Sequence, residues 1–339
     1  MTTKVLFVSL NADFGQDGVL KYDDAGNPTN ESWEKGSVFP AWQKLADEGL
    51  VDLQTHWVDQ QSDPKGLERL VSIAKDVDFV FQIPVTHALG IHLPQSRKII
   101  EGGTPIVSYH PDAHLRYRWP GGDRFVLSRM VEGYDTHLIT PAQHTLQQFE
   151  DDGWKAYVMP FGVPEFCDRD TEAPKLYDVS FVGQKHGIRQ KVIDDLREIG
   201  VQVHTFGHFW DKHPLHHEER PTYRQMAEIF NQTKVNLNLR WCSRDASFGQ
   251  LKGRDFELMG CGAFMAATQH PECDDMHSLA QPGVDFCEEH YVTKLVGRIK
   301  HYVDAVEERE KMADSFYQKR EANLWTTRFK KFLEDWGTW

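Results

Sequence analysis

The feature that most limits the fold of this 339-residue chain is a regular alternation of short apolar runs with segments of helical periodicity. The runs are rich in Val, Ile and Phe, and several are apolar at successive positions, as strands covered on both faces are. They are 5–10, 51–57, 78–83, 106–109, 137–140, 156–159, 179–182, 201–206, 235–239 and 263–267. Helical patterns between them include 41–48, 67–75, 142–151, 189–199 and 223–231. This alternation predicts an α/β fold with parallel sheets and right-handed crossovers.

The stretch 160–177 divides the alternation into two halves of similar size. It carries Pro160, Gly162, Pro164 and Pro174 with a cluster of charges between two strand patterns, a composition typical of a linker. A chain of this length also predicts two domains at about 150 residues each. We therefore expect two Rossmann-like domains, residues 1–165 and 175–320, facing one another across a cleft. Open α/β sheets bind ligands at the carboxyl ends of their strands, so the cleft should lie there.

Composition excludes several classes of function. Lys plus Arg number 38 against 51 Asp plus Glu, and the net charge of −13 argues against a general polyanion binder. No run approaches the ~18 consecutive apolar residues of a membrane span, and the N-terminal apolar run is too short for a signal peptide. The five cysteines include no Cys-x-x-Cys motif, which predicts neither a disulfide framework nor a zinc knuckle. We expect a cytoplasmic protein.

Basic residues follow the predicted strands of the second half. In FVGQKHGIRQ (181–190) a strand ends at Gly183, and a loop with Lys185 leads to a helix with Arg189 in its first turn. A helix start offers unsatisfied N–H groups and a positive dipole end, which suit a phosphate. In VNLNLRWCSRD (235–245) a strand ends near Arg240. Each pattern also has a structural interpretation, as a βα turn with exposed basic residues or as hydrogen bonders at a sheet end.

A third segment, LKGRDFELMGCGAFMAA (251–267), places Arg254 and Glu257 on one face of a helix that Gly253 opens. A surface ion pair would explain the pair alone, but not the order of elements around it. That order resembles the nucleotide-sugar domain of GT-B glycosyltransferases, in particular the spore-maturation-protein-B (CgeB-like) group of the "group 1" glycosyltransferases. The resemblance spans about 178–333, and its most specific core is GRDFELMGCGAF (253–264) with QPGVDF (281–286). It is weaker at 105–112 and 137–167.

The resemblance implies a GT-B fold in which residues 1–165 bind the acceptor and 175–320 bind the donor. A terminal helix at 321–339 would pack back on the N-terminal domain. Glu257 would hold the ribose hydroxyls of a UDP-linked donor, and Arg254 with the loop from Gly183 to Arg189 would face its diphosphate. Related retaining families carry a second glutamate two helical turns earlier, where this chain has Gly249. The residue that contacts the transferred sugar therefore stays open, although we expect retention.

Glycosyl transfer also needs stabilisation of the charge that develops on the leaving diphosphate. GT-A enzymes use a metal held by an Asp-x-Asp motif, and no such motif follows a strand here. Arg189, Arg240 and Arg254 can serve instead, because a guanidinium binds phosphate in a bidentate manner. We expect no metal and no cofactor beyond the nucleotide-sugar co-substrate.

A histidine-rich segment, HFWDKHPLHHEERP (208–221), contains zinc-compatible residue types. These are His213, His216, His217 and Glu218. Their spacing fits neither His-Glu-x-x-His nor a Cys/His finger. We expect a solvated loop at the cleft rim, with nucleobase contact as the nearer functional alternative.

Two loops of the first half follow predicted strands and are candidates for the acceptor side. One, at 9–19, carries Asn11, Asp13 and Gly15, and the other, at 108–124, carries His110 and Asp112. If the reaction inverts the anomeric centre, His110 or Asp112 is the candidate general base. If it retains, a leaving phosphate oxygen can take the acceptor proton, and the two residues position substrate. A His–Asp pair that caps the loop is the structural alternative.

The sequence thus predicts a hexosyl- or pentosyltransferase whose acceptor is a glycan, a protein, a small molecule or a modified nucleic-acid base. An epimerase or hydrolase of the same fold would turn over the donor without an acceptor. A binding module would bind the donor without turnover.

Overall fold

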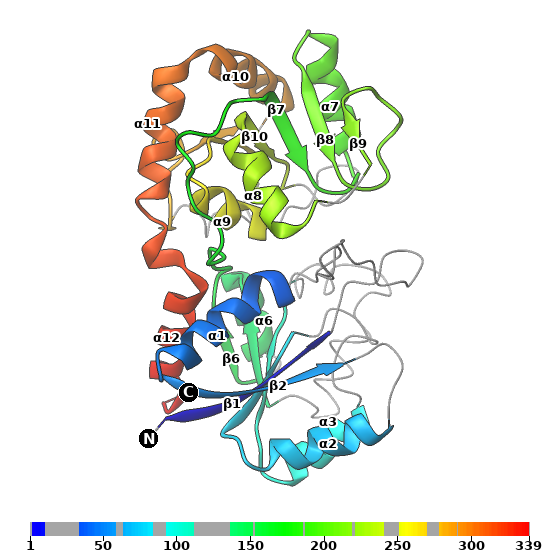
Figure 1. Ribbon diagram of the computed structural model, residues 1–339, viewed down its shortest axis with the longest axis vertical. Coiled ribbons are helices and arrows are strands. Elements are labelled where there is room, and N and C mark those ends of the chain that lie inside the picture. The colour runs from blue at the N-terminus through cyan, green and yellow to red at the C-terminus, as the bar shows by residue number, and fades with distance from the viewer. Residues whose placement is uncertain are drawn as a thin grey trace. The chain divides into compact units, whose positions relative to one another are not determined.

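The computed structural model describes residues 2–10, 34–58, 64–83, 93–111, 136–151, 153–185, 187–218, 221–240, 251–269, 278–289 and 291–338. These form two compact units (Figure 1). Unit 1 comprises Met1–Phe161 with Trp325–Trp339, and unit 2 comprises Gly162–Leu324. Within the described ranges, each unit contains one parallel six-stranded sheet flanked by helices. The α/β fold expected from the sequence is confirmed.

The sheet of unit 1 has the strand order β2-β1-β3-β4-β5-β6. Its strands are β1 (Thr3–Leu10), β2 (Val51–Val58), β3 (Phe79–Gln82), β4 (Ile106–Tyr109), β5 (His137–Thr140) and β6 (Ala156–Val158). Strands β3, β4 and β5 are buried at every position, which is why they read as unbroken apolar runs. The helices of this unit are η1 (Glu34–Val38), α1 (Phe39–Asp47), α2 (Pro64–Ala74), α3 (Leu93–Glu101), α6 (Gln143–Asp151) and α12 (Trp325–Trp336).

The terminal helix α12 is part of the core of unit 1, although it is far from the rest of the unit in sequence. Figure 1 shows it in red beside α1. Phe329 and Phe332 are fully buried on one face of α12. The ring of Phe329 stacks on Trp42 of α1 at 4.3 Å, and Phe332 meets Phe79 of β3 edge-on at 5.8 Å. Aromatic side chains three residues apart on α12 therefore pack against α1 and the sheet, as the apolar face of an amphipathic helix should.

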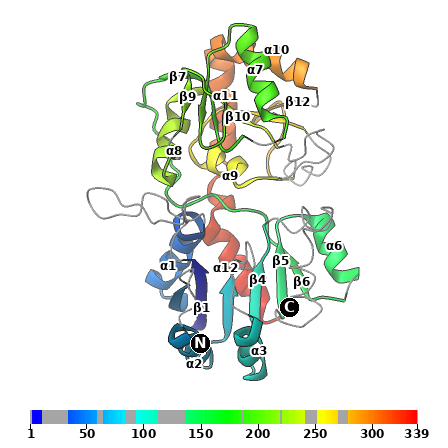
Figure 2. The same cartoon turned by 90° about the vertical axis from the view of Figure 1, so that its right-hand side faces the viewer.

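The sheet of unit 2 has the strand order β12-β11-β10-β7-β8-β9. Its strands are β7 (Tyr177–Val182), β8 (Val203–Phe206), β9 (His216–His217), β10 (Thr233–Asn238), β11 (Met265–Thr268) and β12 (Cys287–Glu289). The helices are α7 (Arg189–Glu198), α8 (Tyr223–Asn231), α9 (Gly253–Gly260), α10 (Val292–Asp304), α11 (Val306–Tyr317) and η3 (Glu321–Asn323). Figure 2 turns both units by 90° and shows α9 close to the carboxyl ends of these strands.

The connectivity of unit 2 creates a switch point between β7 and β10. The chain runs outwards from β7 to β8 and β9, and then returns to β10 and continues to β11 and β12 on the other side. Successive helices therefore leave the sheet in opposite directions at this point. Open α/β sheets bind ligands in the crevice formed there, at the carboxyl ends of the strands.

The polar residues inside β10 are paired within the core, which accounts for their place in an apolar strand. The side-chain amide of Asn236 donates to the Phe264 carbonyl, and its oxygen lies 3.2 Å from the Ser180 hydroxyl of β7. The Thr233 hydroxyl donates to the same Ser180 oxygen at 3.0 Å. Burial of these groups is tolerated because each has a hydrogen-bond partner.

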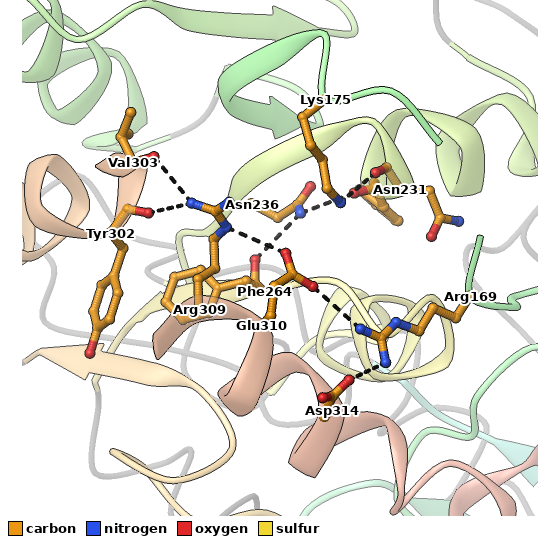
Figure 3. Close-up of polar contacts among 11 residues, drawn as sticks. Arg169, Lys175, Asn231, Asn236, Phe264, Tyr302, Val303, Arg309, Glu310 and Asp314 are labelled. Atoms are coloured by element: carbon orange, nitrogen blue, oxygen red, sulfur yellow. Dashed lines mark hydrogen bonds and ion pairs between the residues drawn. The ribbon is translucent and has the colours of Figure 1, made fainter. Parts of the chain in front are cut away.

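The segment expected to be a linker is ordered by contacts inside unit 2 (Figure 3). Arg169 forms ion pairs with Glu310 and Asp314 of α11, and Lys175 donates to the carbonyl of Asn231 at the end of α8. The segment also lies against the last turn of α9. A Cβ on Gly260 would come within 2.6 Å of atoms of Val163 and Cys167, so the two backbones need a glycine to approach so closely.

Two strands were not expected from the sequence, and each is very short. Strand β9 spans only two residues, in the segment that we expected to be a solvated loop, and pairs in parallel with β8. Strand β12 spans three residues and pairs with β11. Runs of this length carry no periodic signal. Among the described residues, no helix is long and apolar enough to span a bilayer.

Candidate functional site

Helices begin at the carboxyl edge of the unit 2 sheet, and two of them, α7 and α9, bring a first-turn arginine to the ends of β7 and β10. Helix α7 starts at Arg189 after the loop that leaves β7. Helix α9 starts at Gly253, so that Arg254 is its second residue. The first N–H groups of a helix have no partner in the helix and form the positive end of its dipole. The strand ends therefore meet two positive helix ends.

Arg189 spans the switch point itself. Its guanidinium donates to the carbonyl of Gln184, which follows β7, at 3.0 Å. It also donates to the carbonyl of Leu239, which follows β10, at 3.3 Å. The guanidinium carbon lies 5.3 Å from the centre of the Phe181 ring. The side chain is thus held between the ends of the two strands where a ligand would bind.

Arg254 reaches the same strand end from α9. Its Nε donates to Glu257 Oε2 at 2.8 Å, one helical turn along, and its Nη1 donates to the carbonyl of Val182, the last residue of β7. Its guanidinium also lies over the Phe230 ring, 5.0 Å from the centre. Arg254 and Glu257 lie on one helix face, as expected, and they also form the ion pair that was the structural alternative for this motif. The Arg254 side chain is 19% exposed and that of Glu257 is 5% exposed.

The loops after β7 and β8 approach one another closely at two glycines. A Cβ on Gly207 would lie 2.8 Å from the carbonyl oxygen of Gly183, and Gly207 has a φ of +122°. The indole N–H of Trp210 donates to the same oxygen at 2.8 Å, and the Lys185 N–H donates to the His208 carbonyl at 3.1 Å. This close approach depends on glycine, because any side chain would collide. The Gly183 loop is therefore fixed from the side of β8.

Lys185 points from this loop to a surface carboxylate. Its ammonium lies 2.5 Å from Asp211, with side-chain exposures of 33% and 67%. Exposed pairs of this kind contribute little free energy, so a phosphate can compete for the lysine.

The expectation that Arg240 faces the diphosphate is corrected by its burial. The Arg240 side chain is 0% exposed and is paired with Asp255 of α9 and Glu288 of β12. A group sealed inside the unit by two carboxylates does not contact a ligand at the strand ends. Neither Asp255 nor Glu288 was identified from the sequence.

Two thiols lie behind Glu257. Cys167 and Cys261 are both fully buried and neighbour one another. Burial, and then the hydrogen bond with Cys261, raise the pKa of the Cys167 thiol well above its usual value. The Cys167 thiol therefore acts as neutral packing at the end of α9, near the carboxylate of Glu257.

In unit 1, the described candidate lies at the end of β4. His110 is 2% exposed; its backbone N–H donates to the Ile139 carbonyl at 2.8 Å, and its ring packs edge-on against Phe149. Beside it, sequence reasoning missed a buried polar pair, in which the Gln82 side chain donates to the Ser108 hydroxyl at 2.9 Å. In the sequence, the only sign of this pair is a polar residue within each of the apolar runs 78–83 and 106–109. The other candidates, Asn11, Asp13, Gly15 and Asp112, lie outside the described residues.

The histidine-rich segment contributes to the sheet edge. His217 stacks parallel on Phe206 at 4.3 Å, and its Nε2 lies 3.2 Å from His204 Nδ1. Burial lowers the pKa of both His204 and His217, and the neighbouring imidazoles lower it further. In the part of the chain that the structure describes, no group of three or more His, Cys, Asp or Glu residues could hold a metal ion.

Comparisons with known proteins bear on the fold and on the class of protein. Residues 188–334 match the family model described as glycosyl transferase-like. No curated protein matches the sequence. The structure of Anabaena HepE in complex with UDP and glucose is similar, with a TM-score of 0.66 and 11% identity over 99% of this chain and 100% of that chain.

Two further solved structures share the fold. AviGT4, a glycosyltransferase involved in avilamycin A biosynthesis, has a TM-score of 0.60 at 12% identity, over 98% of this chain and 96% of its own. An alpha-glucosyltransferase in complex with UDP-glucose and DNA containing an abasic site has a TM-score of 0.59 at 12% identity, over 98% and 99%. At these identities the likeness shows the fold alone, which is the expected GT-B fold. The family match supports a glycosyltransferase, whereas the narrower CgeB-like assignment stays a prediction.

Proposed function

We propose that the protein transfers a sugar from a UDP-linked donor to an acceptor, and that unit 2 binds the donor. The observation that carries this is the meeting of Arg189 and Arg254 at the ends of β7 and β10, each in the first turn of a helix. Two guanidinium groups beside two helix N-termini stabilise negative charge, and charge develops on the diphosphate as it leaves. The glycosyl transferase-like match over 188–334 supports the same class.

Glu257 is the proposed ribose contact. It lies one turn along α9 from the phosphate end, and Arg254 Nε holds one of its oxygens at 2.8 Å. A carboxylate can accept two hydrogen bonds, which matches the neighbouring hydroxyls of a ribose. Orientation by Arg254 fixes the carboxylate before the donor arrives, which lowers the entropy cost of binding.

The transfer step itself needs no metal ion in this scheme. The bond from the anomeric carbon to the diphosphate oxygen breaks, the acceptor oxygen bonds to that carbon, and its proton passes to the leaving phosphate oxygen. This path retains the anomeric configuration and leaves His110 and Asp112 to position substrate. The burial of His110 against Phe149 argues against a general base at this position. If His110 or Asp112 acted as a general base, the reaction would instead invert the anomeric configuration.

The acceptor is proposed to bind unit 1, where neutral polar side chains end the buried strands. Gln82 and Ser108 are paired there, next to His110. Among acceptors, a modified DNA base is the alternative, which an alpha-glucosyltransferase of similar fold supports because it was solved with UDP and a 13-mer DNA containing an HMU base. The net charge of −13 favours a glycan, protein or small molecule over DNA.

Calorimetric titration tests the donor assignment. We expect UDP and UDP-glucose to bind the wild-type protein, and Glu257→Ala to weaken the binding by about tenfold or more. Glu308→Ala is the matched control, because Glu308 is an exposed carboxylate that pairs with His301. Failure of the wild type to bind any of a UDP-, GDP-, ADP- and dTDP-sugar panel would overturn the proposal.

Product analysis then tests the reaction. Incubation of the protein and UDP-sugar with glycans, peptides, small alcohols and hydroxymethylated DNA should give a glycosylated product from one acceptor class. Donor turnover without any acceptor would instead identify an epimerase or hydrolase. Binding without turnover under every condition would identify a binding module.

A further inference from the structure

Three charged side chains are sealed inside unit 2 beside the start of α9. Arg240, Asp255 and Glu288 have side-chain exposures of 0%, 0% and 3%. Arg240 Nε and Nη2 both donate to Asp255 Oδ1, at 2.9 Å and 2.5 Å, and Nη1 donates to Glu288. These residues come from the end of β10, from α9 and from β12. Together they are called the buried triad below.

A contribution to stability does not by itself explain the buried triad. Removal of charges from water costs free energy, and hydrophobic side chains of similar volume often stabilise a protein as well or better. Two carboxylates surround a single guanidinium, so the formal charges do not balance. Buried ionic groups can, however, select one arrangement of the chain over its alternatives.

The triad fixes the first turn of α9 through both oxygens of one carboxylate. Asp255 Oδ1 accepts from Arg240, while Oδ2 accepts the N–H of Lys252, the residue that caps the helix, at 3.0 Å. The N–H of Arg240 donates to the Thr268 hydroxyl at 2.9 Å, which ties the arginine to the end of β11. The helix start is thus linked to the ends of three strands.

The residue next to Asp255 is Arg254, whose guanidinium must reach the carbonyl of Val182 across the switch point. We propose that Arg240 and Asp255 are positioning residues that hold the first turn of α9 so that Arg254 and Glu257 meet the donor, whereas Glu288 compensates the charge of Arg240 from β12. This inference rests on the proposed function for the donor contact itself. The positioning of the helix start is a separate physical claim.

The members of the triad allow a matched comparison. Asp255 belongs to α9 and contacts its cap directly, whereas Glu288 contacts Arg240 from β12 and does not touch the helix start in the described contacts. Asp255→Asn and Glu288→Gln each remove one buried negative charge with little change in volume. A triad that only stabilises the fold would respond alike to both substitutions.

The experiment measures three quantities for each full-length variant. They are the thermal midpoint, the hydrogen exchange rates of the amides of residues 252–256, and the affinity for UDP. We expect both variants to lower the midpoint. Asp255→Asn should in addition speed exchange at the start of α9 by about tenfold and weaken UDP binding by about tenfold. Glu288→Gln should change both by less than about threefold.

Equal changes in exchange rate and in UDP affinity in the two variants would overturn the inference. Unchanged exchange of the amides of residues 252–256 in Asp255→Asn would overturn it as well. If the wild type binds no UDP, the proposed function fails, and the exchange comparison still decides whether Arg240 and Asp255 position the helix start. Arg240→Lys is used if Asp255→Asn does not fold. It keeps the positive charge but loses the two-nitrogen contact, so it should expose the same amides to exchange. Unchanged protection in Arg240→Lys would overturn the inference equally.

Discussion

The carboxyl edges of the two sheets carry different kinds of side chain. In unit 1 the described strand ends carry buried neutral groups, among them Gln82 and Ser108. In unit 2 they meet two arginines, together with the buried triad. One α/β architecture therefore carries two kinds of edge, one with buried neutral polar groups and one with arginines at helix starts.

The position of the switch point also differs. In unit 1 the first strand, β1, lies between β2 and β3, whereas in unit 2 the first strand, β7, lies between β8 and β10. In unit 2 the chain thus adds two strands on one side before it reverses. The helix that starts after the reversal, α9, brings Arg254 and Glu257 to the strand ends. Topology decides which helix start reaches the switch point.

The largest expected effect tests the charged edge against the neutral one. Replacement of both Arg189 and Arg254 by Ala should weaken UDP binding by about a hundredfold or more, because two charge-assisted hydrogen-bond donors are lost. Ser108→Ala, on the edge of unit 1, should leave the UDP affinity within about twofold. Calorimetry at fixed salt measures both. A comparable loss in Ser108→Ala would break the distinction between the two edges.

The next effect concerns the glycine contact that fixes the Gly183 loop. Gly207→Ala should lower the free energy of unfolding by about 2–3 kcal/mol, because the Cβ meets the Gly183 carbonyl and φ is positive. Gly200→Ala is the control, since Gly200 has a φ of +86° with nothing within 4 Å of the added carbon. It should cost about 1 kcal/mol. Equal losses in urea denaturation would show that the close approach has no energetic role.

A pH effect is expected in unit 1, where a histidine is kept neutral. Burial, and then the charge of Lys155, lower the pKa of His137 to about 4. The unfolded chain binds a proton near pH 6.5 and the folded one does not, so stability is full above that pH and falls as the pH falls towards 4. The loss should be about 2 kcal/mol.

Urea unfolding at pH 7 and pH 4.5 measures this loss. His137→Phe should remove that part of the pH dependence and leave the contribution of the unit 2 histidines. An unchanged difference between the two pH values in His137→Phe would assign the effect to other groups.

The smallest expected effect is a gain in affinity for UDP. Asp211→Asn should tighten UDP binding by about two- to threefold at low salt, because Lys185 is released from its carboxylate, and the gain should shrink as salt rises. Asp195→Asn is the matched control, since Asp195 pairs with Lys191 on the exposed side of α7. A weaker affinity in Asp211→Asn would mean that Asp211 orients the lysine for the donor.

Much of the fold could be read from the sequence because its central strands are buried on both faces. The expected runs at 106–109 and 137–140 coincide with β4 and β5, since an apolar run bounded by turns has few other uses. Strands β9 and β12 escaped notice because two or three residues form a strand only when a neighbour is already in place. Their pairing is a tertiary property.

The candidate site was predictable where partners are local. Arg254 and Glu257 are three residues apart on a helix, so their pairing follows from spacing. Arg240 was misassigned because its partners lie 15 and 48 residues away. A polar residue at a strand end looks the same in sequence whether it faces a ligand or a buried carboxylate.

The placement of α12 has a consequence for the order in which the protein forms. Unit 2 is one continuous stretch, Gly162–Leu324, whereas unit 1 needs a helix that is synthesised after all of unit 2. Until α12 leaves the ribosome, Trp42 and Phe79 lack the rings of Phe329 and Phe332 that cover them. Domains generally fold from the N-terminus as they emerge. Here the half that is translated first can close its core only at the end, and residues 1–161 expressed alone would expose an aromatic surface prone to aggregation.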